Sequence, residues 1–186
     1  LQLVQAPWLA LLDHDDLLPA DALIWVAKAI EADPDARLLY SDEDKISSDG
    51  KLFDPYFKGD WNPLLMEAQN TFSHLGIYST ELVRRLGGFR EGLEGSQDHD
   101  LVLRCSEQLQ RHQIVHIPRV LYHWRVHPES TAGGAKAKPY TVKAAERAIT
   151  EHLQRRKLPL RQLSWSPVGF RADLALPDLA PRVSVI

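Results

Sequence analysis

The sequence has little of several features that mark specialised protein classes. Its 186 residues include one cysteine, Cys105, which excludes an internal disulfide and a metal site built from cysteines. No apolar run approaches the roughly 20 residues that a membrane-spanning helix requires. The formal net charge is −3, which argues against a protein that binds nucleic acid. A single cysteine suits a reducing compartment, so we expect a cytoplasmic protein.

The rest of the composition is that of an ordinary globular protein, with 44% hydrophobic and 25% charged residues. The charge is unevenly distributed. Residues 1–60 hold 13 acidic against 5 basic side chains, whereas residues 101–161 hold 4 against 12. This asymmetry allows an acidic, cation-binding edge beside a basic segment that faces phosphates, or simply two solvated surfaces that neutralise each other.

The first 45 residues predict an α/β domain. Residues 8–12 form an apolar strand of the kind buried in a parallel sheet, and residues 38–40 form a second one. An amphipathic helix that starts at Pro19 separates them. Each strand runs into an acidic group, at 13–16 and at 42–44. A strand, a helix and a strand in this order indicate an α/β architecture.

The remainder of the chain continues the pattern. We predict a loop region over 47–63, and further helices and strands after it. The helices are expected over 64–69, 80–86, 97–109 and 140–156, and the strands over 75–78, 114–117, 120–124, 160–165 and 170–174.

The acidic group at 13–16 is the strongest candidate for chemistry. In open α/β sheets, ligands bind beyond the carboxyl ends of the strands. Asp13, Asp15 and Asp16 place three carboxylates within four residues. Their mutual repulsion is relieved by a divalent cation such as Mg²⁺ or Mn²⁺, which prefers oxygen ligands. The alternative is a turn in which an aspartate caps the following helix.

Asp98 is a candidate general base. It would lie in the first turn of the helix that begins near Gln97, where the helix dipole favours an ionised carboxylate. Such a carboxylate could accept a proton from an attacking hydroxyl. The alternative is an acidic first turn that only stabilises the helix.

The segment from Tyr122 to His127 is a third candidate. In a strand, His123, Arg125 and His127 would share one face, with Tyr122 and Trp124 on the other. Histidine can bind a metal and arginine can hold a phosphate, but both also serve structural roles.

Together these segments resemble a family-2 glycosyltransferase of the GT-A fold. The matching motifs occur in the order found in that family and cover roughly residues 8–157. They are LLDHDD (11–16), YSDEDK (40–45), GGFRE (87–91), QDHDLVLR (97–104) and YHWRVHPEST (122–131).

The resemblance implies a role for each matching residue. Asp13 and Asp15 match the Asp-X-Asp motif that holds the metal and the nucleotide-sugar donor. Asp98 matches the general base, although Gln97 stands where the family has glutamate. His127 is expected to complete the metal site, with His123 as the competing residue.

Further site residues are assigned on the same basis. We expect Arg125 to bind the donor diphosphate together with Asp13. Gly88, Glu94 and Trp61 are expected on the acceptor side, and Trp61 could stack on a sugar ring or serve the core.

The family's first strand does not precede Leu1, and residues 181–186 resemble that opening strand. We therefore expect a partial GT-A domain, a mixed sheet flanked by helices, that lacks the N-terminal nucleotide-binding half. Residues 1–157 would be its C-terminal portion, 158–181 a small β linker region, and 182–186 the start of a following domain. An exposed sheet edge in such a fragment would favour a homodimer.

The predicted parent activity is inverting, metal-dependent transfer of a sugar to a glycan or lipid-linked glycan, in bacterial surface polysaccharide synthesis. That setting would place the parent at the inner face of the membrane, and the fragment alone is expected to be inactive. One alternative is a degenerate, non-catalytic scaffold or sugar-binding module. Another is a phosphohydrolase with an Asp-X-Asp nucleophile, but Leu17 stands where such enzymes have threonine or valine.

Overall fold

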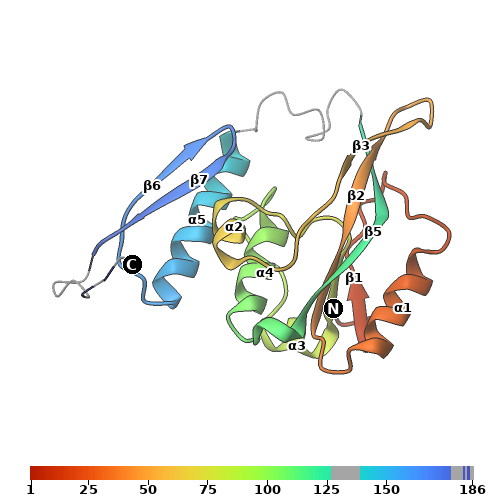
Figure 1. The fold of residues 1–186 in the computed structure, drawn as a ribbon, viewed down its shortest axis with the longest axis horizontal. Helices are drawn as coiled ribbons and strands as arrows, with labels where there is room; N and C mark the ends of the chain where they lie inside the picture. The colour runs from red at the N-terminus through yellow and green to blue at the C-terminus, as the bar shows by residue number, and fades with distance from the viewer. Residues whose placement is uncertain (127–138, 177–181, 183, 185–186) are drawn as a thin grey trace.

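The computed structural model describes residues 1–126 and 139–176, together with 182 and 184 (Figure 1). Its centre is a five-stranded mixed sheet with the order β1-β4-β2-β3, and β5 also pairs with β2. The strands are β1 (Trp8–Ala10), β2 (Leu38–Ile46), β3 (Leu52–Tyr56), β4 (Gly76–Ser79) and β5 (Ile114–Arg125). On one side, β2 pairs antiparallel with β4 and then with β3, and on the other it pairs parallel with β5 along its whole length.

Helices cover both faces of the sheet. The α-helices are α1 (Ala22–Ala32), α2 (Pro63–Ala68), α3 (Thr80–Arg85), α4 (Gln97–Ser106) and α5 (Pro139–Arg155), with a 3₁₀ helix η1 (Arg111–Gln113) before β5. Leu38 and Tyr40 pack with α4 and α5 on one face, while Leu39 packs with α1 on the other. Neighbouring β2 residues point to opposite faces, so burial of both faces explains the continuous apolar run.

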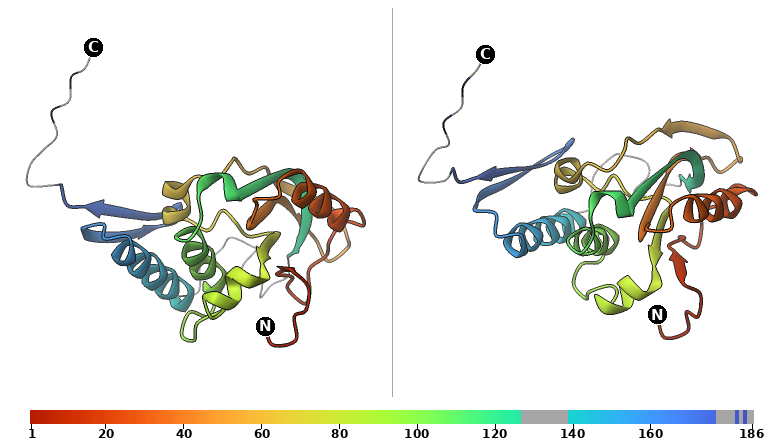
Figure 2. Two further views of the ribbon diagram at one scale, coloured as in Figure 1. Left: turned by 90° about the horizontal axis from the view of Figure 1, so that it is seen from below. Right: turned by 60° about the horizontal axis from the view of Figure 1, so that its bottom comes forward.

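A second sheet is the hairpin of β6 (Leu160–Ser166) and β7 (Gly169–Leu174). It lies along α5, at the end of the molecule away from α1 (Figures 1 and 2). Leu163, Phe170 and Ala172 pack against the main core. At Gly169, φ is +126° and an added Cβ would stand 2.7 Å from the carbonyl oxygen of Ala68, so the turn fits against α2 only with glycine.

The structure corrects four of the expectations from sequence. The acidic residues 42–44 lie inside β2 and are buried, where His116, Lys58 and His123 pair with them. The expected loop over 47–63 contains β3, and the two strands expected over 114–124 are one. The strand at 8–12 is shorter and is an edge strand, which explains why Ala10 is exposed.

The fold class inferred from the motifs is confirmed as a mixed α/β sheet flanked by helices. In the part of the chain that the structure describes, no helix is both long and apolar enough to span a membrane.

Candidate active site

A cavity of about 640 Å³ collects the main candidates for chemistry. Asp13, after β1, and Asp98, at the start of α4, both line it. Trp124 of β5 and His74, just before β4, contribute to the same lining, and the turn of the β6–β7 hairpin forms another part. The cavity therefore lies where β1, β4, β5 and the start of α4 meet the β6–β7 hairpin.

The loop that carries Asp13 is fastened to β5. The buried carboxylate of Asp16 accepts hydrogen bonds from the Tyr122 hydroxyl at 2.5 Å and from the backbone N–H of Arg125 at 2.7 Å. The Nε of Arg125 donates to the carbonyl oxygen of Asp15 at 2.6 Å, and the N–H of Asp13 to the Tyr122 hydroxyl at 3.3 Å. Arg125, which the resemblance assigns to the diphosphate, thus also holds the acidic loop in place.

Asp13 faces the cavity in an electrostatically unfavourable setting. Partial burial raises the pKa of Asp13, and the nearby carboxylates of Asp16, Asp98 and Asp15 raise it further, while His74 lowers it. Among the described residues, no lysine or arginine forms an ion pair with the Asp13 carboxylate. A bound cation would supply positive charge at this position, and a carboxylate is a ligand type that Mg²⁺ and Mn²⁺ prefer.

Metal coordination by the remaining predicted ligands is less complete. In the described part of the chain, no three side chains of His, Cys, Asp or Glu converge in a group able to hold a metal. Asp15 does not line the cavity, and His127 lies outside the described residues. His123, the competing candidate, binds Asp44 through Nδ1 at 2.5 Å instead.

Asp98 lies in the first turn of α4, as predicted. Its Oδ2 accepts a hydrogen bond from the Nδ2 of Asn70 at 2.7 Å, which fixes the orientation of the carboxylate. No other described residue donates to it, so Oδ1 can accept a proton from a ligand in the cavity. Gln97 does not support it, because its Oε1 accepts from the N–H of Gly95 at 2.6 Å.

His74 is a site residue that the sequence analysis missed. Its ring stacks on Tyr122 with centroids 4.6 Å apart and lies 5.3 Å from Trp124. On its other side, Glu43 accepts the backbone N–H of His74 and approaches Nδ1 to 3.3 Å. No ligand-like spacing marks His74 in the sequence, since its partners come from β2 and β5.

Behind the cavity, β2 carries a buried charged network. Glu43 forms an ion pair with Lys58 at 3.3 Å. The carboxylate of Asp42 accepts hydrogen bonds from the His116 ring at 2.8 Å and from the backbone N–H of Lys58 at 2.8 Å. Burial lowers the pKa of Lys58 to about 8, although Glu43 and Asp42 favour its charged form. The network positions the segment around His74, because the Nζ of Lys58 also donates to the carbonyl oxygen of His74 at 2.7 Å.

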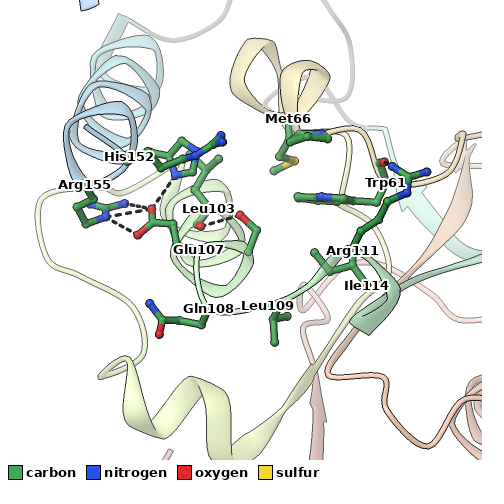
Figure 3. Close-up of a pocket in the computed structure, with 13 residues that line it drawn as sticks. Trp61, Met66, Leu103, Glu107, Gln108, Leu109, Arg111, Ile114, His152 and Arg155 are labelled. Carbon is green, nitrogen blue, oxygen red and sulfur yellow. Dashed lines mark hydrogen bonds and ion pairs between the residues drawn. The ribbon is translucent and has the colours of Figure 1, made fainter. Parts of the chain in front are cut away.

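The structure does not bring the three expected acceptor-side residues to this cavity. Trp61 is buried in the core and lines a separate cavity of about 650 Å³ with Met66 and Leu103 (Figure 3). Gly88 has φ +73° and lies beneath Leu1, and its carbonyl oxygen accepts from Arg104 at 2.6 Å. Glu94 is exposed and its Oε1 accepts the N–H of Gly92. Turn geometry and core packing therefore place these three residues away from the cavity that Asp13 and Asp98 line.

Comparison with known proteins identifies the fold. No protein-family profile matches the chain. The structure of S. aureus TarS 1–349 in complex with UDP-GlcNAc is similar, with a TM-score of 0.59 and 19% identity. The similarity covers 82% of this chain and 44% of the TarS chain, and the TarS complex with UDP gives a TM-score of 0.52. The chain therefore has part of the GT-A fold.

Two curated proteins are similar in sequence. The chain is 46% identical over 189 residues to the uncharacterized protein y4gI of Sinorhizobium fredii, and 36% identical over 175 residues to the O-antigen biosynthesis protein RfbC of Myxococcus xanthus. The alignments include 100% and 94% of this chain, which spans 21% and 14% of the length of these relatives. The resemblance to the GT-A fold inferred from the motifs is thus confirmed, and one of the two relatives is named for O-antigen biosynthesis.

Proposed function

We propose that this chain supplies the acceptor-activating and leaving-group side of an inverting glycosyltransferase. The enzyme would transfer a sugar from a nucleotide donor to a hydroxyl of a glycan during polysaccharide synthesis. The observation that carries the proposal is that Asp13 and Asp98 line one cavity and interact electrostatically. The donor class follows from TarS, whose structures contain UDP-GlcNAc and UDP.

In this proposal, Asp98 is the general base. Asn70 holds Oδ2, and Oδ1 accepts the proton of the acceptor hydroxyl as its oxygen attacks the anomeric carbon. The bond from that carbon to the nucleoside diphosphate breaks in the same step. A single displacement of this kind inverts the anomeric configuration.

Asp13 would bind a divalent cation, with Asp15 and His127 as the further predicted ligands. Such a cation, when bound, neutralises the charge that develops on the leaving diphosphate. The hydrogen bonds from Tyr122 and Arg125 keep the acidic loop in position for this role. Partial burial of Asp13 strengthens its interaction with a cation, because the effective dielectric constant is lower there.

The deciding experiment is Asp98→Asn in the full-length protein. Loss of the base should lower transfer about 10²- to 10⁴-fold, because general-base catalysis contributes that much. Binding of UDP with Mn²⁺, measured by calorimetry, should remain within about twofold, since the nearby cation site is intact. Glu94→Gln, an exposed acidic residue on the preceding loop, is the matched control. Transfer near the wild-type rate would reject Asp98 as the base.

A non-catalytic saccharide-binding module is the second candidate, favoured by Gln97. Its side chain binds Gly95 and so gives Asp98 no acidic neighbour at that position. Absence of transfer in the wild-type protein, together with retained donor binding, would favour this candidate.

A further inference from the structure

Part of the wall of the candidate cavity is aromatic. Trp165, Phe89 and Tyr140 all line the cavity and remain 49%, 49% and 54% exposed. Trp165 belongs to the β6–β7 hairpin, a segment that the sequence analysis treated as a linker. Large aromatic side chains that stay exposed inside a cavity offer contact area to a ligand.

The register of the hairpin explains why Trp165 faces the cavity. Trp165 lies opposite Phe170, and Leu163 lies opposite Ala172. Opposed residues and residues two apart along a strand share one face of the sheet. Leu163, Phe170 and Ala172 pack against the main core, so this face of the hairpin is turned toward the body of the domain. Trp165 lies on the same face, two residues nearer the turn than Leu163, and this face reaches the cavity there.

The hairpin and Asp98 share one support. Gly169 packs against the end of α2, so closely that a Cβ would stand 2.7 Å from the Ala68 carbonyl oxygen. Asn70, two residues after Ala68, donates a hydrogen bond to the Asp98 carboxylate. The hairpin turn next to Trp165 and the carboxylate of Asp98 are therefore both held by the chain segment at the end of α2.

We propose that the turn of the β6–β7 hairpin binds the acceptor, with Trp165 as the platform on which a pyranose ring of the glycan stacks. The inference rests on the proposed function, which makes Asp98 the base for an acceptor hydroxyl. A pyranose fits a cavity with aromatic and polar lining, because its C–H face can pack on the electron-rich indole while its hydroxyls reach polar groups. Asp98, Asn70 and Gln69 provide those polar groups in the same cavity. An acyl chain fits less well, because it would leave these groups without partners.

The test uses the full-length protein and saturation-transfer NMR with the methyl glycosides of glucose, galactose, rhamnose and N-acetylglucosamine. At least one glycoside should bind the wild type, and Trp165→Ala should weaken that binding about tenfold, because the stacking contact is lost. Trp165→Phe should retain most of it, since an aromatic face remains. Arg161→Ala, an exposed position of β6 outside the cavity, is the matched control and should bind normally.

Several results would overturn the inference. They are no binding of any glycoside by the wild type, equal binding by Trp165→Ala, or an equal loss in Arg161→Ala. A loss of binding to phospholipid vesicles in Trp165→Ala, without a loss of glycoside binding, would assign the hairpin to a membrane surface instead.

Calorimetry with UDP and Mn²⁺ separates this inference from the proposed function. Trp165→Ala should bind UDP as the wild type does. Loss of glycoside binding alone in Trp165→Ala would confirm that Trp165 binds the acceptor sugar. A wild-type protein that binds glycosides but neither UDP nor Mn²⁺ would reject the proposed transferase function, while sugar binding at Trp165 would stand.

Discussion

Two acidic segments of similar composition have opposite surroundings in this fold. In the buried segment 42–44, each acid has a basic partner: His116 for Asp42 at 2.8 Å, Lys58 for Glu43 at 3.3 Å and His123 for Asp44 at 2.5 Å. In the segment 13–16, Asp16 is held by hydrogen bonds and Asp15 lies 3.7 Å from the exposed His14. The Asp13 carboxylate forms no ion pair with any described residue, and only the more distant His74 lowers its pKa.

The difference separates structural from functional acids. Carboxylates that are paired with buried side chains of the protein itself are part of the folded core and are not accessible to a ligand. A carboxylate that faces a cavity among other carboxylates costs stability until a cation arrives. The position of the partner, rather than the density of acids, therefore marks the candidate site.

Asp13→Asn should have the largest effect and should act on function alone. We expect transfer by the full-length protein to fall about 10³-fold, because the main candidate ligand for the cation is lost. The melting temperature without metal should stay the same or rise, since the raised pKa shows that the ionised carboxylate is unfavourable in the folded state. Thermal shift assays with and without Mn²⁺ measure both consequences.

In the wild type, Mn²⁺ should raise the melting temperature, and in Asp13→Asn this shift should disappear. An equal shift in both proteins would show that the cation binds elsewhere. Glu94→Gln again serves as the control, because this acid is exposed and outside the cavity.

Glu43→Gln should act on stability. Lys58 is buried and would lose its closest carboxylate, which should cost about 3 kcal/mol of unfolding free energy. For a domain of this size, the melting temperature would then fall roughly 6–12 °C. Chemical denaturation gives the free energy directly. If Glu43→Gln and Asp13→Asn had the same stability, the proposed distinction between the two acidic segments would be wrong.

A smaller effect is expected at His152, whose built-in partners are Glu107 and Glu67 at 2.6 and 3.7 Å. Burial disfavours the charge of His152, but the hydrogen bond to Glu107 and the nearby carboxylate of Glu67 outweigh it and raise the pKa. Its contribution is fully present below about pH 6.5, the ordinary histidine pKa, and is lost as the pH rises through the raised value.

The comparison of wild type with His152→Gln isolates this contribution. The difference in urea midpoint should be largest near pH 6 and should shrink toward pH 9. A difference that is constant over this range would mean that packing, rather than charge, explains the role of His152.

The sequence predicted those features that depend on local pattern. Helix α4, with Asp98 in its first turn, and the hairpin strands β6 and β7 follow from apolar periodicity and turn residues. The site as a whole could not be predicted in this way. Asn70 and His74 reach the cavity through contacts with residues that are 28 to 31 positions away, and no spacing rule encodes such contacts.

The wrong expectations have the same physical origin. The sequence predicts that the strand ends before residues 42–44, because charged side chains are rarely buried. Their burial depends on Lys58, His116 and His123, which the fold brings from other segments. For Trp61 the sequence leaves a sugar contact and a core position open, because large aromatic side chains suit both, and the structure places it in the core with Met66 and Leu103.

The hydrogen bonds from Tyr122 and Arg125 to Asp16 have a consequence for how the chain folds during its synthesis. These hydrogen bonds join positions 106 and 109 residues apart, so the acidic loop reaches its final shape only after β5 has been synthesised and has paired with β2. A nascent chain that stalls before β5 would display repelling carboxylates next to an incomplete sheet. The cation affinity that we propose would therefore arise only after this long-range pairing, and not with the early α/β unit.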